Sequence, residues 1–127
     1  MKRYLTGVAL YLMLAGAAHA ELPSATEAEV TRALSSGKPA VIDLGARSCI
    51  PCKKMAPILE TLSGEYRGRG AVLFIDVHDN PAAASRFRIQ MIPTQIFFDA
   101  KGKEFKRHIG FMDKAEIVKE LKAAGLK

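Results

Sequence analysis

The sequence is poor in the residues that build metal centres and haem sites. Its 127 residues include only two cysteines and three histidines. A structural metal site needs further ligands at workable spacing, and beyond residue 20 the chain offers only His78 and His108 besides carboxylates. Covalent haem attachment needs a histidine directly after the second cysteine of a pair, and position 53 is lysine. Metal binding is therefore a minor alternative, and haem attachment is excluded.

The chain also lacks a long apolar run and a concentrated charge. The longest nearly uncharged apolar stretch, residues 4–17, has about 14 residues, whereas a helix that spans a bilayer needs roughly 20. The formal net charge of +6 comes from scattered basic residues, without the interleaved aromatic side chains that grip nucleic acid. We find no internal repeat and no low-complexity linker. These absences indicate one soluble globular domain that does not bind nucleic acid.

Residues 1–20 have the pattern of a secretory signal peptide. A positively charged start is followed by the apolar run and then by a small-x-small cleavage site, Ala18-His19-Ala20. We therefore predict cleavage after Ala20, a mature domain over residues 21–127, and a periplasmic or secreted location. A retained membrane anchor is the alternative. Export would place both cysteines in a compartment that permits disulfides.

Helix and strand signals alternate along the rest of the chain. Overlapping capping boxes, Ser24 with Glu27 and Thr26 with Glu29, predict a first helix that begins near Ala25. Strand, helix and strand in that order imply a right-handed parallel crossover. The expected elements that follow the first helix are a strand at 40–45, a helix at 49–66, a strand at 71–77, a helix at 81–87, strands at 95–99 and 103–109, and a helix capped by Asp113.

Cys49 and Cys52 lie where an apolar strand ends and a helical pattern begins. The positive end of a helix dipole favours a thiolate over a thiol, and Arg47, Lys53 and Lys54 are candidate cations for the same effect. A purely structural bridge that closes four residues is worth only about 2 kcal/mol. Dithiol–disulfide exchange next to a strand–helix–strand unit is therefore the favoured interpretation.

Two further features accompany the cysteine pair. Asp43 interrupts the buried strand, and desolvation raises the pKa of a carboxyl so that it can hold or pass a proton near neutral pH. The alternative is that Asp43 lies at the end of the strand and reaches water. Pro93, within Ile92-Pro93-Thr94, precedes another apolar strand and is either a trans turn residue or a cis proline.

In order and spacing these motifs resemble those of the thioredoxin family, from about Ala25 to Ala124. The resemblance rests on Val41-Ile42-Asp43, Cys49-Ile50-Pro51-Cys52, the run from Lys54 to Leu59, Ile75-Asp76, Ile92-Pro93-Thr94, and Gly110 before the last helix. It implies a thioredoxin fold, an α/β domain with a central mixed four- or five-stranded sheet flanked by helices, and no cofactor. With its signal peptide the chain is similar to exported thioredoxin-like proteins of bacteria.

The resemblance also implies a role for each site residue. Cys49 would attack the substrate disulfide, and Cys52 would resolve the mixed disulfide. Asp43 would exchange a proton with Cys52 through water, and Pro93 would be the cis proline beside the cysteines. The groove that holds the substrate backbone would include Ile50, Pro51, Ile92, Thr94 and Gly110.

A protein-disulfide reductase is the expected activity, because Pro51 and Ile92 match the reductase-like members of the family. The implied substrates are exported proteins with disulfides, apocytochrome c among them, and a membrane thiol electron donor would recharge a monomeric enzyme. A disulfide oxidase or isomerase, and a redox-inactive thioredoxin-fold binding module, are the alternatives.

The chain departs from the family pattern in four places. Ser48 replaces the usual tryptophan, and the sequence has none. Ile50 replaces the usual glycine between the cysteines, and Val72 stands where a buried lysine commonly neighbours the acid. The pKa of Asp43 should then be less restrained from rising. Little sequence remains before the first helix for the family's first strand.

Overall fold

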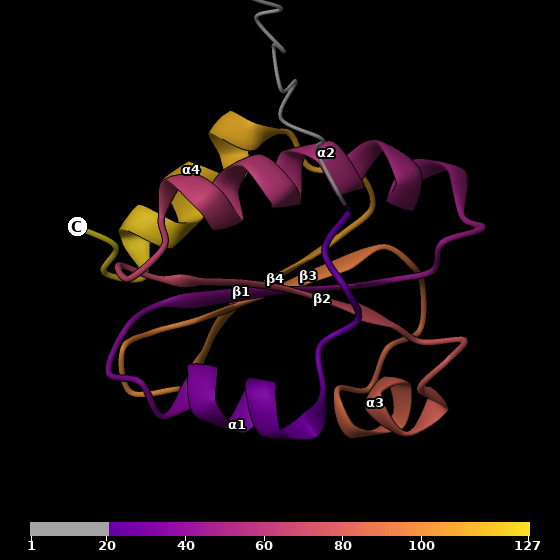
Figure 1. The fold of residues 1–127 in the computed structure, drawn as a ribbon, viewed down its shortest axis with the longest axis horizontal. Coiled ribbons are helices and arrows are strands. Elements are labelled where there is room, and N and C mark those ends of the chain that lie inside the picture. Colours follow the sequence, from indigo (N-terminus) through magenta and orange to yellow (C-terminus); the bar gives the residue numbers. More distant parts are fainter. Residues whose placement is uncertain (1–20) are drawn as a thin grey trace, which may run out of the picture.

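The computed structural model describes residues 21–127, which form a central sheet between two layers of helices (Figure 1). The predicted signal peptide, residues 1–20, lies outside the described residues. Within the described part of the chain, no helix combines the length and apolarity needed to cross a membrane. The elements in chain order are α1 (Glu27–Leu34), β1 (Ala40–Gly45), α2 (Ile50–Glu65), β2 (Ala71–Asp76), α3 (Pro81–Arg86), β3 (Thr94–Phe98), β4 (Glu104–Ile109) and α4 (Lys114–Ala123).

The sheet has four strands in the order β2-β1-β3-β4. Strands β1 and β2 are parallel and are joined through α2, while β3 runs antiparallel to both β1 and β4. Helices α2 and α4 cover one face of the sheet, and α1 and α3 lie on the other (Figure 1). The structure thus confirms the predicted mixed sheet flanked by helices, in its four-stranded form.

Only a trace of a fifth strand remains beside β2. Ser24 forms an isolated parallel bridge with Phe74, and its hydroxyl accepts the backbone N–H of Asp76 at 3.0 Å. The Ser24 side chain is therefore occupied and does not cap a helix. Instead the capping box is Thr26 with Glu29, and α1 begins two residues later than predicted.

Strand β1 is buried at every position because β2 and β3 flank it and helices cover both faces. On the α2–α4 face the core includes Met55, Leu59 and Leu62, each at most 2% exposed. Burial of a large apolar side chain stabilises the fold by about 1.5–3 kcal/mol. The same cluster contains Val41 of β1 and Phe74 of β2, so α2, which carries the cysteines at its start, packs on these two strands.

Candidate active site

Cys49 and Cys52 form a disulfide at the start of α2, with 5.1 Å between their Cα atoms. Cys49 is the N-cap, and its sulfur accepts the backbone N–H of Cys52 at 3.3 Å. That hydrogen bond and the helix dipole both favour negative charge on this sulfur when the pair is reduced. Cys49 is partly exposed, whereas Cys52 is 5% exposed. The two sulfurs therefore differ in their access to solvent.

Asp76, at the end of β2, holds the loop that leads to the cysteines. Its carboxylate accepts the backbone N–H of Arg47 at 3.2 Å, and those of His78 and Asp79 at 2.8 and 3.2 Å. Burial acts to raise the pKa of Asp76, but these three hydrogen bonds outweigh it and lower the pKa. A charged carboxylate therefore anchors the backbone two residues before Cys49.

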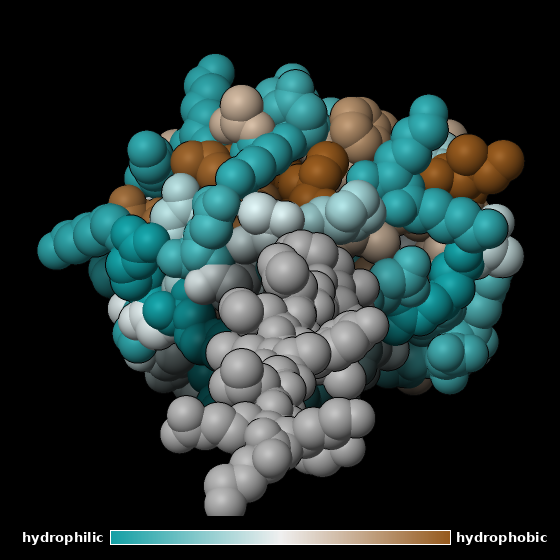
Figure 2. All heavy atoms as spheres, turned by 45° about the horizontal axis from the view of Figure 1, so that its top comes forward, coloured by the Kyte–Doolittle hydropathy of each residue, from teal (hydrophilic) through white to brown (hydrophobic). Residues whose placement is uncertain are grey.

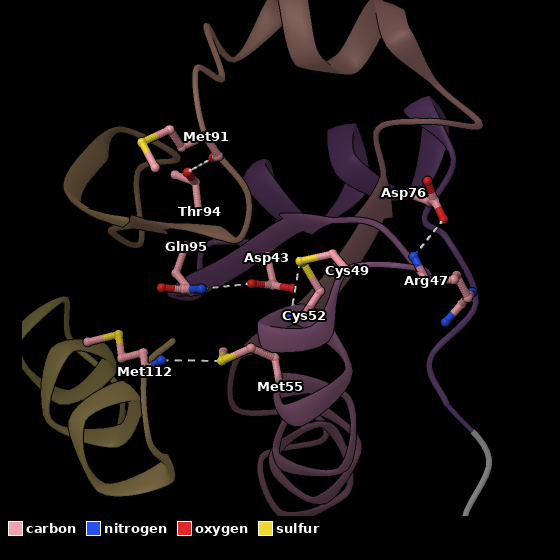
Figure 3. Close-up of a disulfide and its surroundings, with 10 residues drawn as sticks. All are labelled: Asp43, Arg47, Cys49, Cys52, Met55, Asp76, Met91, Thr94, Gln95 and Met112. Atoms are coloured by element: carbon pink, nitrogen blue, oxygen red, sulfur yellow. Dashed lines mark hydrogen bonds between the residues drawn. A yellow bond between two sulfur atoms is a disulfide. The ribbon is translucent and has the colours of Figure 1, made fainter. Parts of the chain in front are cut away.

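Asp43 lies under the disulfide in the middle of β1 and is fully buried. The alternative that it reaches water at the strand end is therefore wrong. Oδ1 accepts a hydrogen bond from Gln95 Nε2 at 2.9 Å, whereas Oδ2 has no hydrogen-bond partner among the described residues. Burial raises the pKa of Asp43 to about 6, and the hydrogen bond from Gln95 opposes that rise. In Figure 3 the carboxylate lies between Gln95 and the two sulfurs.

The peptide bond between Ile92 and Pro93 is cis. Leu44 pairs with Thr94 across β1 and β3, so Pro93 reaches the end of β1 from which the cysteine loop departs. The carbonyl of Pro93 accepts the backbone N–H of Gly110 at 2.8 Å. Gly110 has a φ of 101°, a conformation that favours glycine. The structure thus brings two predicted groove segments together at this end of the sheet.

Exposed apolar side chains concentrate on these same segments. Ile50 lies between the cysteines and is 69% exposed, and Met91 precedes Ile92 and is 63% exposed. Ile109 and Phe111, on either side of Gly110, are also exposed. On the face in Figure 2, hydrophobic groups emerge singly among mostly hydrophilic side chains. These exposed side chains belong to the three segments that carry the cysteines, the cis proline and Gly110.

The predicted contribution of Arg47 to the thiolate is not supported by its contacts. Its guanidinium binds the Glu21 carboxylate at 2.9 Å and the Leu22 carbonyl at 2.7 Å, and it stacks on the Phe74 ring. Lys53 and Lys54 are exposed. Among residues 21–127 no group of three or more His, Cys, Asp or Glu side chains is arranged to hold a metal ion.

Sequence reasoning missed the residues that support the site from neighbouring strands. Gln95 reaches Asp43 from β3, and its Oε1 lies 2.8 Å from His108 Nδ1 on β4. Their sequence signal was present, because a glutamine interrupts an apolar strand and a histidine lies on the strand that follows. The exposed Met91, Ile109 and Phe111 were also missed, although they flank the predicted groove motifs.

Comparisons with known proteins match most of the chain to thioredoxins. Residues 21–123 match the family model described as Thioredoxin. The chain is 34% identical over 96 residues to a thioredoxin of Staphylococcus aureus, covering 76% of this chain and 90% of that protein. It is 41% identical over 88 residues to a bifunctional thioredoxin reductase/thioredoxin of Mycobacterium leprae, covering 69% of this chain. The match spans 19% of that longer protein.

Solved structures agree with the sequence matches. Chloroplastic thioredoxin z has a TM-score of 0.70 and 29% identity, covering 83% of this chain and 95% of that one. A mutant thioredoxin from Halobacterium salinarum has a TM-score of 0.71 and 27% identity, covering 81% and 88%. Similarity of fold and of sequence therefore extends over the same domain.

Proposed function

The chain belongs to the thioredoxin family, and from this premise we propose that it reduces disulfides in exported proteins. The general activity, thiol–disulfide exchange, follows from the family and from the Cys49–Cys52 pair. The observation that carries the proposal is the unequal exposure of the two sulfurs at the start of α2. The partly exposed Cys49 sulfur would meet the protein substrate, and the nearly buried Cys52 would act on Cys49.

The reaction begins with the reduced pair. The Cys49 thiolate attacks one sulfur of a substrate disulfide, forms a mixed disulfide and expels the other substrate sulfur as a thiolate. Cys52 then loses its proton and attacks the Cys49 sulfur, which releases the second substrate thiolate. Two electrons have passed to the substrate, and the enzyme is left with the Cys49–Cys52 disulfide, the state seen in the structure.

Asp43 is the proton acceptor for Cys52 in this scheme. Its carboxylate is buried beneath the pair, and a pKa of about 6 leaves it mostly ionised at neutral pH yet basic enough to take a proton. Pro93 and Gly110 shape the groove beside the sulfurs. The exposed Ile50, Met91 and Phe111 give that groove an apolar rim for the chain on either side of a substrate disulfide.

We also propose that the protein is exported, recharged by a membrane electron donor, and active on exported substrates. The signal pattern in residues 1–20 supports release as a mature chain beginning at Glu21. A reductase in an oxidising compartment must be recharged, so its donor is a membrane protein that carries thiol electrons across the bilayer. Its substrates are exported proteins with reducible disulfides, including apocytochrome c.

The reduction potential tests the direction of the reaction. Equilibration with glutathione is expected to give a potential of about −270 mV, the value of thioredoxin, because the chain resembles the reductase-like members of the family. The wild type should also reduce insulin disulfides when dithiothreitol recharges it, and Cys49→Ser should not. A potential of about −120 mV, that of a strong oxidant, with no insulin reduction, would identify an oxidase instead.

A fractionation experiment tests the export proposal. The full chain, expressed in a Gram-negative host, should appear in the periplasm with Glu21 as its N-terminal residue by mass spectrometry. A variant without residues 2–20 is the control and should stay in the cytoplasm. Recovery of the full chain with an intact N-terminus in the membrane fraction would favour a retained anchor.

A further inference from the structure

Three polar side chains form a row across the sheet, which begins beside the disulfide and leads to the edge strand β4. Asp43 pairs with Gln95 across β1 and β3, and Gln95 pairs with His108 across β3 and β4. Neighbouring residues in register project from the same face of a sheet. The row therefore lies on the face that α2 covers, and Figure 3 shows its inner part, with Gln95 beside Asp43 and the sulfurs beyond.

Both ends of the Gln95 carboxamide are used. Nε2 donates to Asp43 Oδ1 at 2.9 Å, and Oε1 lies 2.8 Å from His108 Nδ1. A carboxamide oxygen only accepts, so Nδ1 must carry the hydrogen and donate it. Gln95 is fully buried, and His108 is half-buried on the edge strand β4. The row thus runs from a buried carboxylate to an imidazole at the rim of the sheet.

We propose that Gln95 and His108 are positioning residues for thiol–disulfide exchange, which link the Asp43 carboxylate beneath the cysteines to an imidazole at the sheet edge. His108 fixes the Gln95 amide, and the fixed amide presents its N–H to Asp43. The inference rests on exchange at Cys49 and Cys52 and is independent of its direction, reduction or oxidation.

Gln95 donates the hydrogen bond that the Asp43 carboxylate accepts, and the other close neighbours of Asp43 in the core are apolar. The strand neighbour of Asp43 on β2 is Phe74, and α2 contributes Met55 to the same core. Val72 is also apolar and belongs to that core. The titratable or charged groups on the elements packed against this face are Cys49 and Cys52 on α2, Asp76 at the end of β2, Lys106 and His108 on β4, and Glu120 on α4, which pairs with Lys106 at 2.7 Å.

The sign of the effect follows from the direction of the hydrogen bonds. An N–H donated to a carboxylate stabilises its charged form, so loss of the Gln95 donor raises the pKa of Asp43 further. A protonated Asp43 cannot accept the proton of Cys52. Loss of His108 acts the same way but more weakly, because the amide remains and only its orientation is released.

The test follows the carboxyl carbon of Asp43 by NMR as pH is varied, alongside the pH profile of exchange. In Gln95→Leu the Asp43 midpoint and the acid limb of the profile should both move upward by about one pH unit, roughly tenfold in proton affinity. His108→Leu should move them less in the same direction. Gln95→Met provides a second variant if leucine disturbs the packing.

Two variants separate positioning from a general effect of charge or packing. His108→Asn places an amide N–H where Nδ1 stood and should keep the wild-type midpoint. Lys106→Gln removes a positive charge from the same strand without touching the row, and it should also leave the midpoint unchanged. A shift in either variant that equals that of His108→Leu would overturn the proposal.

The double variant decides whether His108 acts through Gln95. With Gln95→Leu already present, His108→Leu should cause no further shift. If His108→Leu shifts the Asp43 midpoint as much with Gln95→Leu present as without it, or if no variant moves the midpoint, the proposal is wrong and the three side chains have only a structural role. If the NMR midpoints shift as expected but the protein does not exchange thiols, the link from His108 through Gln95 to Asp43 stands and the proposed function is wrong.

Discussion

Cys52→Ser should convert the enzyme into a trap for its substrates. Cys49 still attacks a disulfide, but no neighbouring thiolate remains to displace the captured sulfur. Turnover should fall at least about 100-fold, because release then depends on thiols from solution rather than on a group held in contact. Non-reducing electrophoresis should show mixed disulfides, and mass spectrometry should identify the substrates.

Cys49→Ser is the matched control for this trap. It removes the partly exposed sulfur and leaves Cys52, which is only 5% exposed, so we expect a protein substrate not to reach it. It should therefore lose turnover equally and accumulate no adducts. Adducts with Cys49→Ser and none with Cys52→Ser would reverse the roles of the two cysteines.

Asp43→Asn should make the protein more stable at neutral pH and slow its thiol–disulfide exchange. The folded-state pKa of Asp43 is about 6, above its ordinary value of 3.8. A carboxyl whose pKa is raised by folding favours the folded state fully below pH 3.8, and this advantage is lost as pH rises through 6. At pH 7 the charged, buried group therefore costs on the order of 3 kcal/mol, which the neutral amide avoids.

Denaturant unfolding at several pH values measures this effect. The stability gain of Asp43→Asn should be largest near pH 7 and vanish below about pH 4, while exchange at pH 7 slows about 100-fold because the proton acceptor is gone. Asp79→Asn, at an exposed position next to β2, is the control and should change neither property. Equal stability of Asp43→Asn and wild type at pH 7 would show that burial does not strain this carboxylate.

Local pattern predicted the elements that position the cysteines. The apolar run of β1, the helical spacing of Met55, Leu59 and Leu62, and the break between them were enough to place Cys49 at the start of a helix, as the structure confirms. The buried position of Asp43 also followed from one acid in an apolar strand. These features depend on periodicity and burial, which neighbouring residues carry along the chain.

Features that depend on pairing between distant segments were not predictable in this way. The partnership of Gln95 with Asp43 and His108 needs the register of three strands, which no single stretch encodes. Of the two capping boxes predicted for α1, the structure forms Thr26 with Glu29, while the Ser24 hydroxyl accepts the backbone N–H of the distant Asp76. The roles of the site residues, the export and the partners stay predictions.

The contact between Arg47 and Glu21 has a practical consequence for recombinant work. It fastens the start of the described chain to the segment that ends at Cys49. An affinity tag fused ahead of Glu21 would therefore emerge close to the reactive sulfur and compete with bulky substrates. An affinity tag is better placed after Lys127, where it should not interfere with assays of substrate reduction.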